Sequence, residues 1–377
     1  MDVVETFKIS KMGVITMTEK QYDIKKVYTV SLEDHFLHPK VWELFPNNIK
    51  EKYALLKDSL IDIGENRIKI MDASGIDFQV ISHVEPCLSL VDNVEDAVQL
   101  AKEINNYLYE AISKNPKRLG GFAILPMQSP VDASKELRRA VKELGFKGAM
   151  INGHHNGLYL DDESYSILLS TAEELDVPIY IHPTNPPKEI SEKYYQNNDI
   201  VITGWAWQVE TALHLIRMIS NGTFDKHPKL KIIVGHMGEL IPFGFTRLNQ
   251  SLTMGSWILK SDTPKMNLHY YFKNNIFVTS SGVFDEPVFC CTKEMLGIDN
   301  LMFSVDYPFQ DNVNATDFLN KLNINNQERT LFSGVTACKL LKLNNNELPT
   351  NIATRSEIFK IKLKSRFGKF LISKLVK

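Results

Sequence analysis

The chain has 377 residues, of which 44% are hydrophobic and 10% aromatic, and its formal net charge is −2. This composition supports a full hydrophobic core, in one large domain or in two ordinary ones. Because the charge is nearly balanced, and no basic patch with interleaved aromatic residues precedes the C-terminal segment, nucleic acid is excluded as a partner.

The N-terminal residues 1–26 form an extension in which charges interrupt every short apolar stretch, unlike a secretory signal peptide. No later apolar run is long enough to cross a bilayer. These features predict a soluble, cytoplasmic protein. The cysteines lack CxxC spacing, so we expect all four to be reduced core thiols: Cys87, Cys290, Cys291 and Cys338.

Eight short apolar segments have the composition of buried parallel strands. In chain order they are VYTVSL ending at Leu32, FQVISHV to Val84, GGFAILP to Pro126, GAMIN to Asn152, PIYIHP to Pro183, KIIVGH to His236, IFVTSS to Ser281 and LMFSVD to Asp306.

Amphipathic helical patterns lie between these strands, most clearly over residues 94–115, 131–144 and 209–219. A doubly wound sheet would usually carry a glycine-rich phosphate loop, and this sequence has none. The regular alternation therefore predicts the α/β class, with a single (β/α)₈ TIM barrel over residues 27–343.

Four side chains that can bind a metal lie where predicted strands end: Glu33 and His35 after the first, His182 after the fifth and Asp306 at the eighth. The C-terminal ends of barrel strands meet at one mouth. Residues two apart on a strand share a face, which places Glu33 and His35 together. The set suits one divalent cation, and zinc, manganese and magnesium all stay open.

Simpler explanations exist for each residue taken alone. Glu33 and His35 can be a satisfied polar pair, and His182 a hydrogen-bonded core histidine. Asp306 is different, because a buried carboxylate is costly unless it is paired or bound to a cation. The recurrence of such residues at strand ends favours a metal site over independent polar caps.

The sixth strand ends at His236, in the segment IIVGHMGE, and Glu239 and Arg247 lie at the start of the next helix. A carboxylate is stabilised near the positive N-terminus of a helix. We therefore expect His236 to act as an acid or base, with Glu239 beside it.

Together these motifs resemble the amidohydrolase superfamily, and within it the metal-dependent decarboxylases of dihydroxybenzoate, gamma-resorcylate, 5-carboxyvanillate and aminocarboxymuconate semialdehyde. The segments that carry the resemblance are LEDHF, RIKIMDASGID, GFAILPMQ, KGAMINGHHNGLYLDD, VPIYIHP, GWAWQVETALHLI, HPKLKIIVGHMGELIPF and LMFSVDYPF. The Glu-x-His at the first strand marks this subgroup, where most hydrolases of the superfamily have His-x-His.

The resemblance implies that Glu33, His35, His182 and Asp306 bind the metal, and that His236 and Glu239 lie beside the substrate. It also implies a homodimer or homotetramer. One departure is the segment SHVEPCLSL after the second strand, which replaces the usual small, polar loop and leaves the identity of the substrate open.

Four further residues are candidates for substrate binding. Arg247 would orient the carboxylate of Glu239 or pair with it. The loop NGHHNG, with Asn152 and His154, would line the aromatic pocket, although a glycine-rich turn is an equal alternative. Trp205, with Trp207, would form a wall against a flat ring, and ordinary packing is the alternative.

These residues predict a carboxy-lyase acting on an ortho-hydroxylated aromatic acid. The ring carbon must be protonated before carbon dioxide leaves, and Asp306 is the expected donor, with His236 the alternative donor and Glu239 in the relay. Two other functions stay open. The same residues could serve a hydrolase of esters, lactones or amides, and a catalytically silent barrel could use its tail for binding.

Residues 344–377 form a tail, which from residue 352 onward holds eight Lys or Arg and one acidic residue. Residues 358–377 have the pattern of an amphipathic helix. Contact with an anionic membrane is the less favoured use of this tail, behind a subunit contact or disorder.

Overall fold

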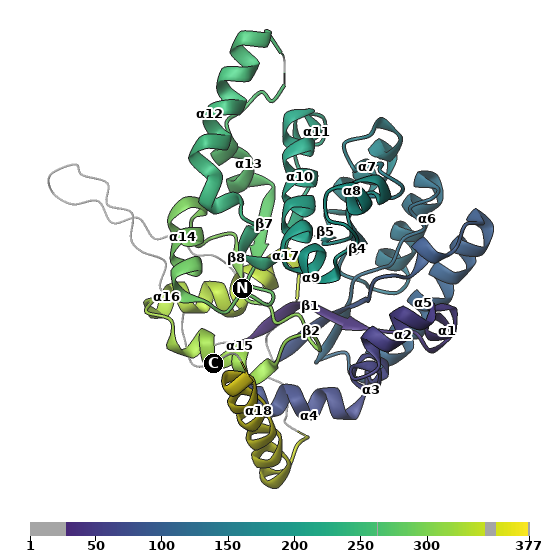
Figure 1. Ribbon diagram of the computed structural model, residues 1–377, viewed down its shortest axis with the longest axis vertical. Helices are drawn as coiled ribbons and strands as arrows, with labels where there is room; N and C mark the ends of the chain where they lie inside the picture. Colours follow the sequence, from purple (N-terminus) through teal and green to yellow (C-terminus); the bar gives the residue numbers. More distant parts are fainter. Residues whose placement is uncertain (1–27, 262, 344–351, 376–377) are drawn as a thin grey trace, which may run out of the picture.

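Within the described part of the chain, eight parallel strands run through the centre of the molecule (Figure 1). The computed structural model describes residues 28–261, 263–343 and 352–375, so the predicted N-terminal extension lies outside the described residues. Each of the eight predicted segments overlaps one strand. The strands are β1 (Val30–Phe36), β2 (Phe78–His83), β3 (Leu119–Gly121), β4 (Ala149–Asn152), β5 (Ile179–His182), β6 (Ile232–Val234), β7 (Ile276–Thr279) and β8 (Leu301–Met302).

The strands follow one another in sequence order, with β1-β2-β3 in one sheet and β4-β5-β6-β7-β8 in a second. A parallel bridge from Ala123 to Ala149 links the end of the first sheet to the start of the second. Another parallel bridge, from Asp34 to Tyr307, links β1 to the segment that follows β8. Segments far apart in sequence are thereby brought side by side at the ends of β1 and β8.

Helices surround the strands (Figure 1). The three helical patterns of the sequence correspond to α5, α6 and α10, each within two residues of its predicted bounds at either end. The α-helices are α1 (Pro39–Leu44), α2 (Asn47–Tyr53), α3 (Lys57–Ile61), α4 (Glu65–Ser74), α5 (Val94–Lys114), α6 (Pro130–Lys142), α7 (Ser166–Leu175), α8 (Lys188–Lys193), α9 (Asp199–Val201), α10 (Trp207–Ser220), α11 (Thr223–Lys226), α12 (Ile241–Leu259), α13 (Leu268–Asn274), α14 (Glu286–Leu296), α15 (Asn312–Lys321), α16 (Asn326–Thr330), α17 (Thr336–Leu341) and α18 (Arg355–Leu375).

Two hydrophobic clusters divide the core, and the strands contribute to both in alternation. On β5, Ile179 and Ile181 belong to the larger cluster, whereas Tyr180 belongs to the smaller one, with Met150 and Ile233 of the neighbouring strands. Successive side chains of a strand point to opposite faces, so each strand can bury both sides. This explains why the segments read as continuous apolar runs.

The tail is helical from Arg355 to Leu375, which agrees with the helical pattern predicted over residues 358–377 as far as these are described. Helix α18 packs beside α4 and contacts α15 (Figure 1). The Asp72 carboxylate accepts hydrogen bonds from the backbone N–H groups of Ile352 and Ala353 and pairs with Arg118 at 2.7 Å. The start of this segment is therefore tied to the outer helix layer.

The cysteine prediction was wrong in part. Cys87 and Cys338 are buried free thiols, but Cys290 is exposed and Cys291 is half-buried. Both lie on α14, a surface helix whose buried face carries Phe289 and Thr292, and this rotation of the helix turns Cys290 away from the core. Among the described residues, none of the helices is long and apolar enough to span a membrane.

Arg67 is fully buried in α4 and supports the end of β1. Its guanidinium donates hydrogen bonds to the carbonyl oxygens of His35 (2.7 Å), Asp62 (2.8 Å) and Ser59 (3.2 Å). It also lies 4.8 Å from the centre of the Tyr307 ring. One planar group thus joins three segments behind the strand that carries Glu33 and His35.

Replacing this group should destabilise the fold. A lysine ammonium cannot reach three carbonyls in one plane, so we expect Arg67→Lys to lower the free energy of unfolding by about 2–3 kcal/mol. Urea unfolding measures the change. The matched control is Arg138→Lys, at an exposed pair with Glu174, where the loss should stay below about 0.5 kcal/mol. Equal losses in the two variants would contradict this role of Arg67.

Candidate metal centre

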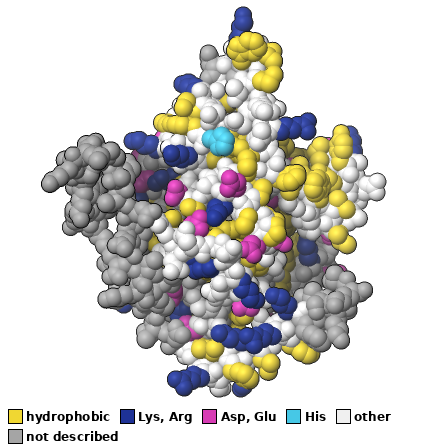
Figure 2. Space-filling model, turned by 90° about the vertical axis from the view of Figure 1, so that its left-hand side faces the viewer, with side chains coloured by type: hydrophobic (Ala, Val, Ile, Leu, Met, Phe, Trp, Pro, Cys, Tyr) yellow, Lys and Arg dark blue, Asp and Glu magenta, His cyan; other side chains and the backbone are white. Residues whose placement is uncertain are grey.

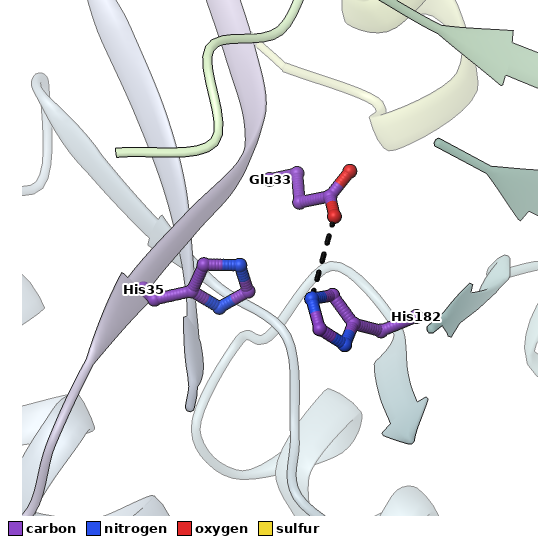
Figure 3. A group of neighbouring side chains, drawn as sticks. All are labelled: Glu33, His35 and His182. Carbon is purple, nitrogen blue, oxygen red and sulfur yellow. Dashed lines mark ion pairs between the residues drawn. The ribbon is translucent and has the colours of Figure 1, made fainter. Parts of the chain in front are cut away.

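Three buried side chains, Glu33 and His35 from β1 and His182 from β5, converge on one point (Figure 3). One ligand atom from each lies within 4.8 Å of the other two. His182 Nε2 is 3.5 Å from Glu33 Oε1, and the two imidazole rings are 4.9 Å apart at their centres. This compact group of nitrogen and oxygen donors is the kind that holds a divalent cation.

A local irregularity in β1 aims these side chains. Leu32 packs in the same cluster as Tyr180, yet the adjacent Glu33 carboxylate accepts a hydrogen bond from the Tyr180 hydroxyl. Strict alternation would send neighbouring residues to opposite faces. The register between β1 and β2 shifts between Ser31 and Asp34, and such a shift turns the following side chains.

Asp306 joins the three residues from the segment after β8. Its backbone N–H donates to the Glu33 carbonyl at 2.7 Å, and its Oδ1 lies 3.2 Å from His35 Nε2. Asp306 has φ 77°, a left-handed conformation that is strained for a residue with a side chain. The structure therefore brings together the four residues for which the sequence predicted metal binding.

The unsatisfied atoms of this group fit a cation. Among the described residues, Glu33 Oε1 and His35 Nε2 are buried and make no hydrogen bond, although His35 Nε2 lies near Asp306 Oδ1. The His182 Nδ1 atom contacts the Pro183 carbonyl at 2.8 Å, which assigns the proton to Nδ1 and leaves the Nε2 lone pair facing Glu33. Two acceptors that face each other at 3.5 Å repel unless a positive charge lies between them.

The protonation states also suit metal binding. Burial lowers the pKa of both His35 and His182 to about 4, so both rings are neutral near pH 7. Burial alone would raise the pKa of Glu33, but His236, His182 and His35 hold it below its ordinary value. Two neutral imidazoles and a carboxylate are the forms in which these groups bind metals.

His236 and Glu239 lie next to this group as an ion pair, with Nδ1 and Oε1 3.0 Å apart. His236 Nε2 is 4.0 Å from Asp306 Oδ2. Burial would lower the pKa of His236, but Glu239, Glu33 and Asp306 raise it to about 10, so the ring carries a proton. Glu239 lies just before α12 and is buried.

The backbone of this loop is strained. His236, Met237, Glu239 and Leu240 all have φ between 48° and 67°, although none is glycine. Each such residue costs roughly 1–3 kcal/mol, and clusters of them occur mainly where a site needs them. The strain supports a functional role for His236 and Glu239.

Sequence reasoning missed Tyr180, whose hydroxyl donates to Glu33 Oε2 and lies 2.6 Å from Thr279 Oγ1. This bond orients the carboxylate and leaves Oε1 free for a ligand. The signal was present in the sequence, because Tyr180 is two residues before His182 and so shares its face of β5.

Gly235 leaves room for this arrangement. A Cβ atom there would lie 2.6 Å from Glu33 Oε2 and 3.1 Å from the Tyr180 hydroxyl. Alanine can adopt the φ of −81° found at Gly235. A side chain is therefore excluded by the lack of room and not by the backbone conformation. We expect Gly235→Ala to displace the carboxylate and weaken manganese binding about 10- to 100-fold.

Titration of metal-free protein with manganese in a calorimeter measures this effect. Gly255→Ala is the control, because no atom lies within 4 Å of a Cβ at that position. Unchanged affinity in Gly235→Ala would show that Glu33 does not need this space.

Aromatic side chains surround the group. The Phe309 ring is 5.6 Å from the His35 ring and 5.8 Å from Tyr53, and the Trp207 ring is 6.4 Å from the His182 ring. Trp207 is fixed by a hydrogen bond from its Nε1 to Asn185 Oδ1 at 2.7 Å. Trp205, which the sequence put forward, is 52% exposed, so the structure favours Trp207 as the wall of the site.

The other candidates for substrate binding occupy different environments. Asn152 pairs in register with His182 and hydrogen-bonds Glu85. His154 accepts a hydrogen bond from the Gly157 N–H, and its Nε2 is 4.0 Å from Glu210. Arg247 lies on α12 with its side chain exposed, and it is not part of the group formed by Glu33, His35, His182 and Asp306.

Glu85 is a second residue that sequence reasoning missed, although its segment was noted as a departure from the family. It follows β2, and its carboxylate accepts hydrogen bonds from Thr184, Asn152 and Ser89. Burial raises the pKa of Glu85 to about 7. A polar group thus lies on the wall formed by β4 and β5.

Comparisons with known proteins agree with this geometry. A profile described as amidohydrolase matches residues 35–343. The chain is 34% identical to a gamma-resorcylate decarboxylase of a Polaromonas strain over 326 residues, which cover 84% of this chain and 98% of that protein.

Solved structures extend the likeness. A dihydroxybenzoic acid decarboxylase of Polaromonas, crystallised with manganese and 2-nitroresorcinol, is 33% identical with a TM-score of 0.77 and covers 85% of this chain and 98% of its own. A 5-carboxyvanillate decarboxylase of Novosphingobium aromaticivorans, with manganese and 4-hydroxy-3-methoxy-5-nitrobenzoic acid, is 30% identical with a TM-score of 0.79. It covers 87% of this chain and 100% of its own.

Proposed function

The chain belongs to the amidohydrolase family, and on this basis we propose that it is a metal-dependent carboxy-lyase that removes carbon dioxide from an ortho-hydroxylated aromatic acid. The main support is the position of Asp306, 3.2 Å from a candidate metal ligand, His35, and 4.0 Å from the protonated His236. A carboxyl group there can carry a proton to a substrate held at the cation.

We propose that Glu33, His35, His182 and Asp306 hold one divalent cation. When bound, such an ion polarises the carboxylate and the ortho hydroxyl of the substrate and fixes the ring in place. Two related structures contain manganese, which supports manganese as this cation. The eight strands, linked by the Asp34–Tyr307 and Ala123–Ala149 bridges, would form the (β/α)₈ barrel that carries these ligands at one end.

Asp306 supplies the proton in this proposal. In the metal-free protein, burial and the neighbouring Glu33 raise the pKa of Asp306 to about 8, so this carboxyl group can take up a proton near neutral pH. The Asp306 carboxyl gives its proton to the ring carbon that bears the carboxylate. The bond between that carbon and the carboxylate then breaks, carbon dioxide leaves, and the bonding electrons restore the aromatic ring.

His236 restores the proton. After transfer Asp306 is left as a carboxylate, and the protonated His236 ring is its nearest source of a proton. Glu239 holds that ring in place by the 3.0 Å contact with Nδ1 and favours its charged form. One proton from solvent is consumed in each cycle, which balances the loss of carbon dioxide from a carboxylate.

A carbon dioxide release assay tests the proposal. The enzyme is stripped of metal, reconstituted with manganese, zinc or magnesium, and given a panel of ortho-hydroxylated benzoic acids. We expect metal-dependent release from at least one acid and none from its meta-hydroxylated isomer, which cannot chelate through both oxygens. Silence of the metal-loaded enzyme across the panel, with turnover of esters or lactones, would instead indicate a hydrolase.

Trp207 should contribute to substrate binding, because its ring stands beside His182 at the site. We expect Trp207→Ala to raise KM about tenfold through the loss of a buried aromatic contact, with a smaller change in kcat. Trp205→Ala is the matched control two residues earlier, and its exposed ring predicts little change. Steady-state kinetics of the two variants separate them, and the opposite order would favour Trp205 as the wall.

A further inference from the structure

Helix α18 lies outside the segment that matches the amidohydrolase family, which ends at residue 343. One side of the helix is attached to the protein. Glu357 pairs with Lys69 of α4 at 2.9 Å, and the Ser365 hydroxyl donates to Asp311 at 2.7 Å. The opposite side of α18 therefore points away from the fold.

That outer side carries a stripe of large apolar side chains. Phe359 is 67% exposed, Leu363 57% and Phe367 60%. With 3.6 residues per turn, residues four apart lie one above the other, so the three form a continuous row. Single exposed apolar residues are ordinary, but a contiguous row marks a surface that meets something apolar.

Cations border this row on both sides. Lys360 and Lys364 fall along one edge, and Lys362 and Arg366 along the other, all of them exposed. The single acidic residue of the described helix is Glu357, which faces Lys69. Figure 2 shows dark blue and yellow side chains gathered together at the lower end of the molecule.

We propose that the outer face of α18 docks the protein on the surface of an anionic lipid bilayer. Phe359, Leu363 and Phe367 would enter the head-group region, while the flanking lysine and arginine side chains extend to the lipid phosphates. The chain as a whole has a net charge of −2, so the positive charge of this face is a property of α18 and not of the whole protein. The helix would lie in the plane of the membrane surface, because no described helix can cross a bilayer.

A second copy of the chain fits this face less well. Two copies of α18 in contact would bring rows of lysine and arginine against each other, without acidic residues on the outer face to pair with them. An anionic bilayer complements both the charge and the apolar row. The proposal is independent of the reaction, because α18 contributes no residue to the metal centre.

Sedimentation with vesicles tests it, using the full-length, manganese-loaded protein. We expect binding to phosphatidylcholine vesicles that contain phosphatidylserine, little binding to phosphatidylcholine alone, and loss of binding in high salt. Lys360→Gln combined with Lys364→Gln should weaken binding about tenfold or more. A second variant, with serine at Phe359, Leu363 and Phe367, should weaken it similarly.

The control is Lys135→Gln with Lys188→Gln, which removes two exposed charges far from α18 in sequence. Carbon dioxide release should be the same in all variants. The sedimentation test does not measure the reaction, so its result stands even if the proposed reaction fails. Absence of binding to phosphatidylserine vesicles, or equal weakening in the control, would overturn the proposal. A dimer in sedimentation velocity that the serine variant dissociates would overturn it too, in favour of a subunit contact.

Discussion

Asp306→Asn is expected to lower kcat by about a thousandfold while manganese stays bound, because an amide cannot deliver the proton that the ring carbon needs. The amide oxygen can still face the cation, and the backbone bond from the Asp306 N–H to the Glu33 carbonyl does not depend on the side chain. Measurement of kcat together with the metal content of the purified variant separates lost chemistry from lost metal.

His236→Asn is the informative companion to that variant. Its imidazole lies 4.0 Å from Asp306 and should replenish the proton, so kcat should also fall, with little change in the free energy of unfolding. If Asp306→Asn retained near-normal turnover and His236→Asn did not, the proton donor would be His236. Near-normal turnover in both variants would exclude this proton path altogether.

Removal of the metal is the second large effect, and it should abolish turnover and change how stability depends on pH. Burial raises the pKa of both Asp34 and Asp306 from an ordinary 3.8 to about 8. The folded state therefore favours their protonated forms, and that stability is lost as the pH rises toward 8. His35 and His182, with pKa values near 4, are neutral above pH 6.5 and do not oppose this trend.

Between pH 6.5 and 8 the metal-free protein should thus lose up to about 1.4 kcal/mol per pH unit for each of these carboxyl groups. Manganese favours the ionised form of Asp306, so the loaded protein should lose less. Thermal unfolding at both pH values, with a chelator or with manganese, gives the comparison. Restored turnover on adding manganese is the control, and identical pH dependence of the two forms would place the cation away from Asp306.

The strands, and the grouping of the four candidate metal ligands at one place, were predictable from the sequence. Each strand is buried on both faces, so it reads as a short apolar run, and a polar residue such as His182 or Asp306 lies at or shortly after its C-terminal end. The parallel arrangement then brings those ends together, whatever the details of the loops. For the same reason the family could be identified from these segments before any geometry was known.

The irregular parts were not predictable in the same way. Sequence periodicity assumes an unbroken strand, and the register shift in β1 is what turns Glu33 toward Tyr180. Periodicity also cannot rank two tryptophans that lie two residues apart, and only the packing of the helix shows that Trp207 approaches His182.

The sequence by itself determined the α/β class, the order of the strands and the polar residues near their C-terminal ends, because buried strands differ from loops in residue type. It did not determine where each strand ends, since β8, for example, ends at Met302 and not at Asp306. The tertiary structure alone decided which side of α18 is exposed, that Cys290 lies at the surface, and that Asp306 stands between His35 and His236. These depend on contacts between segments far apart in the chain. Such contacts rotate and place whole elements without any change in their local pattern.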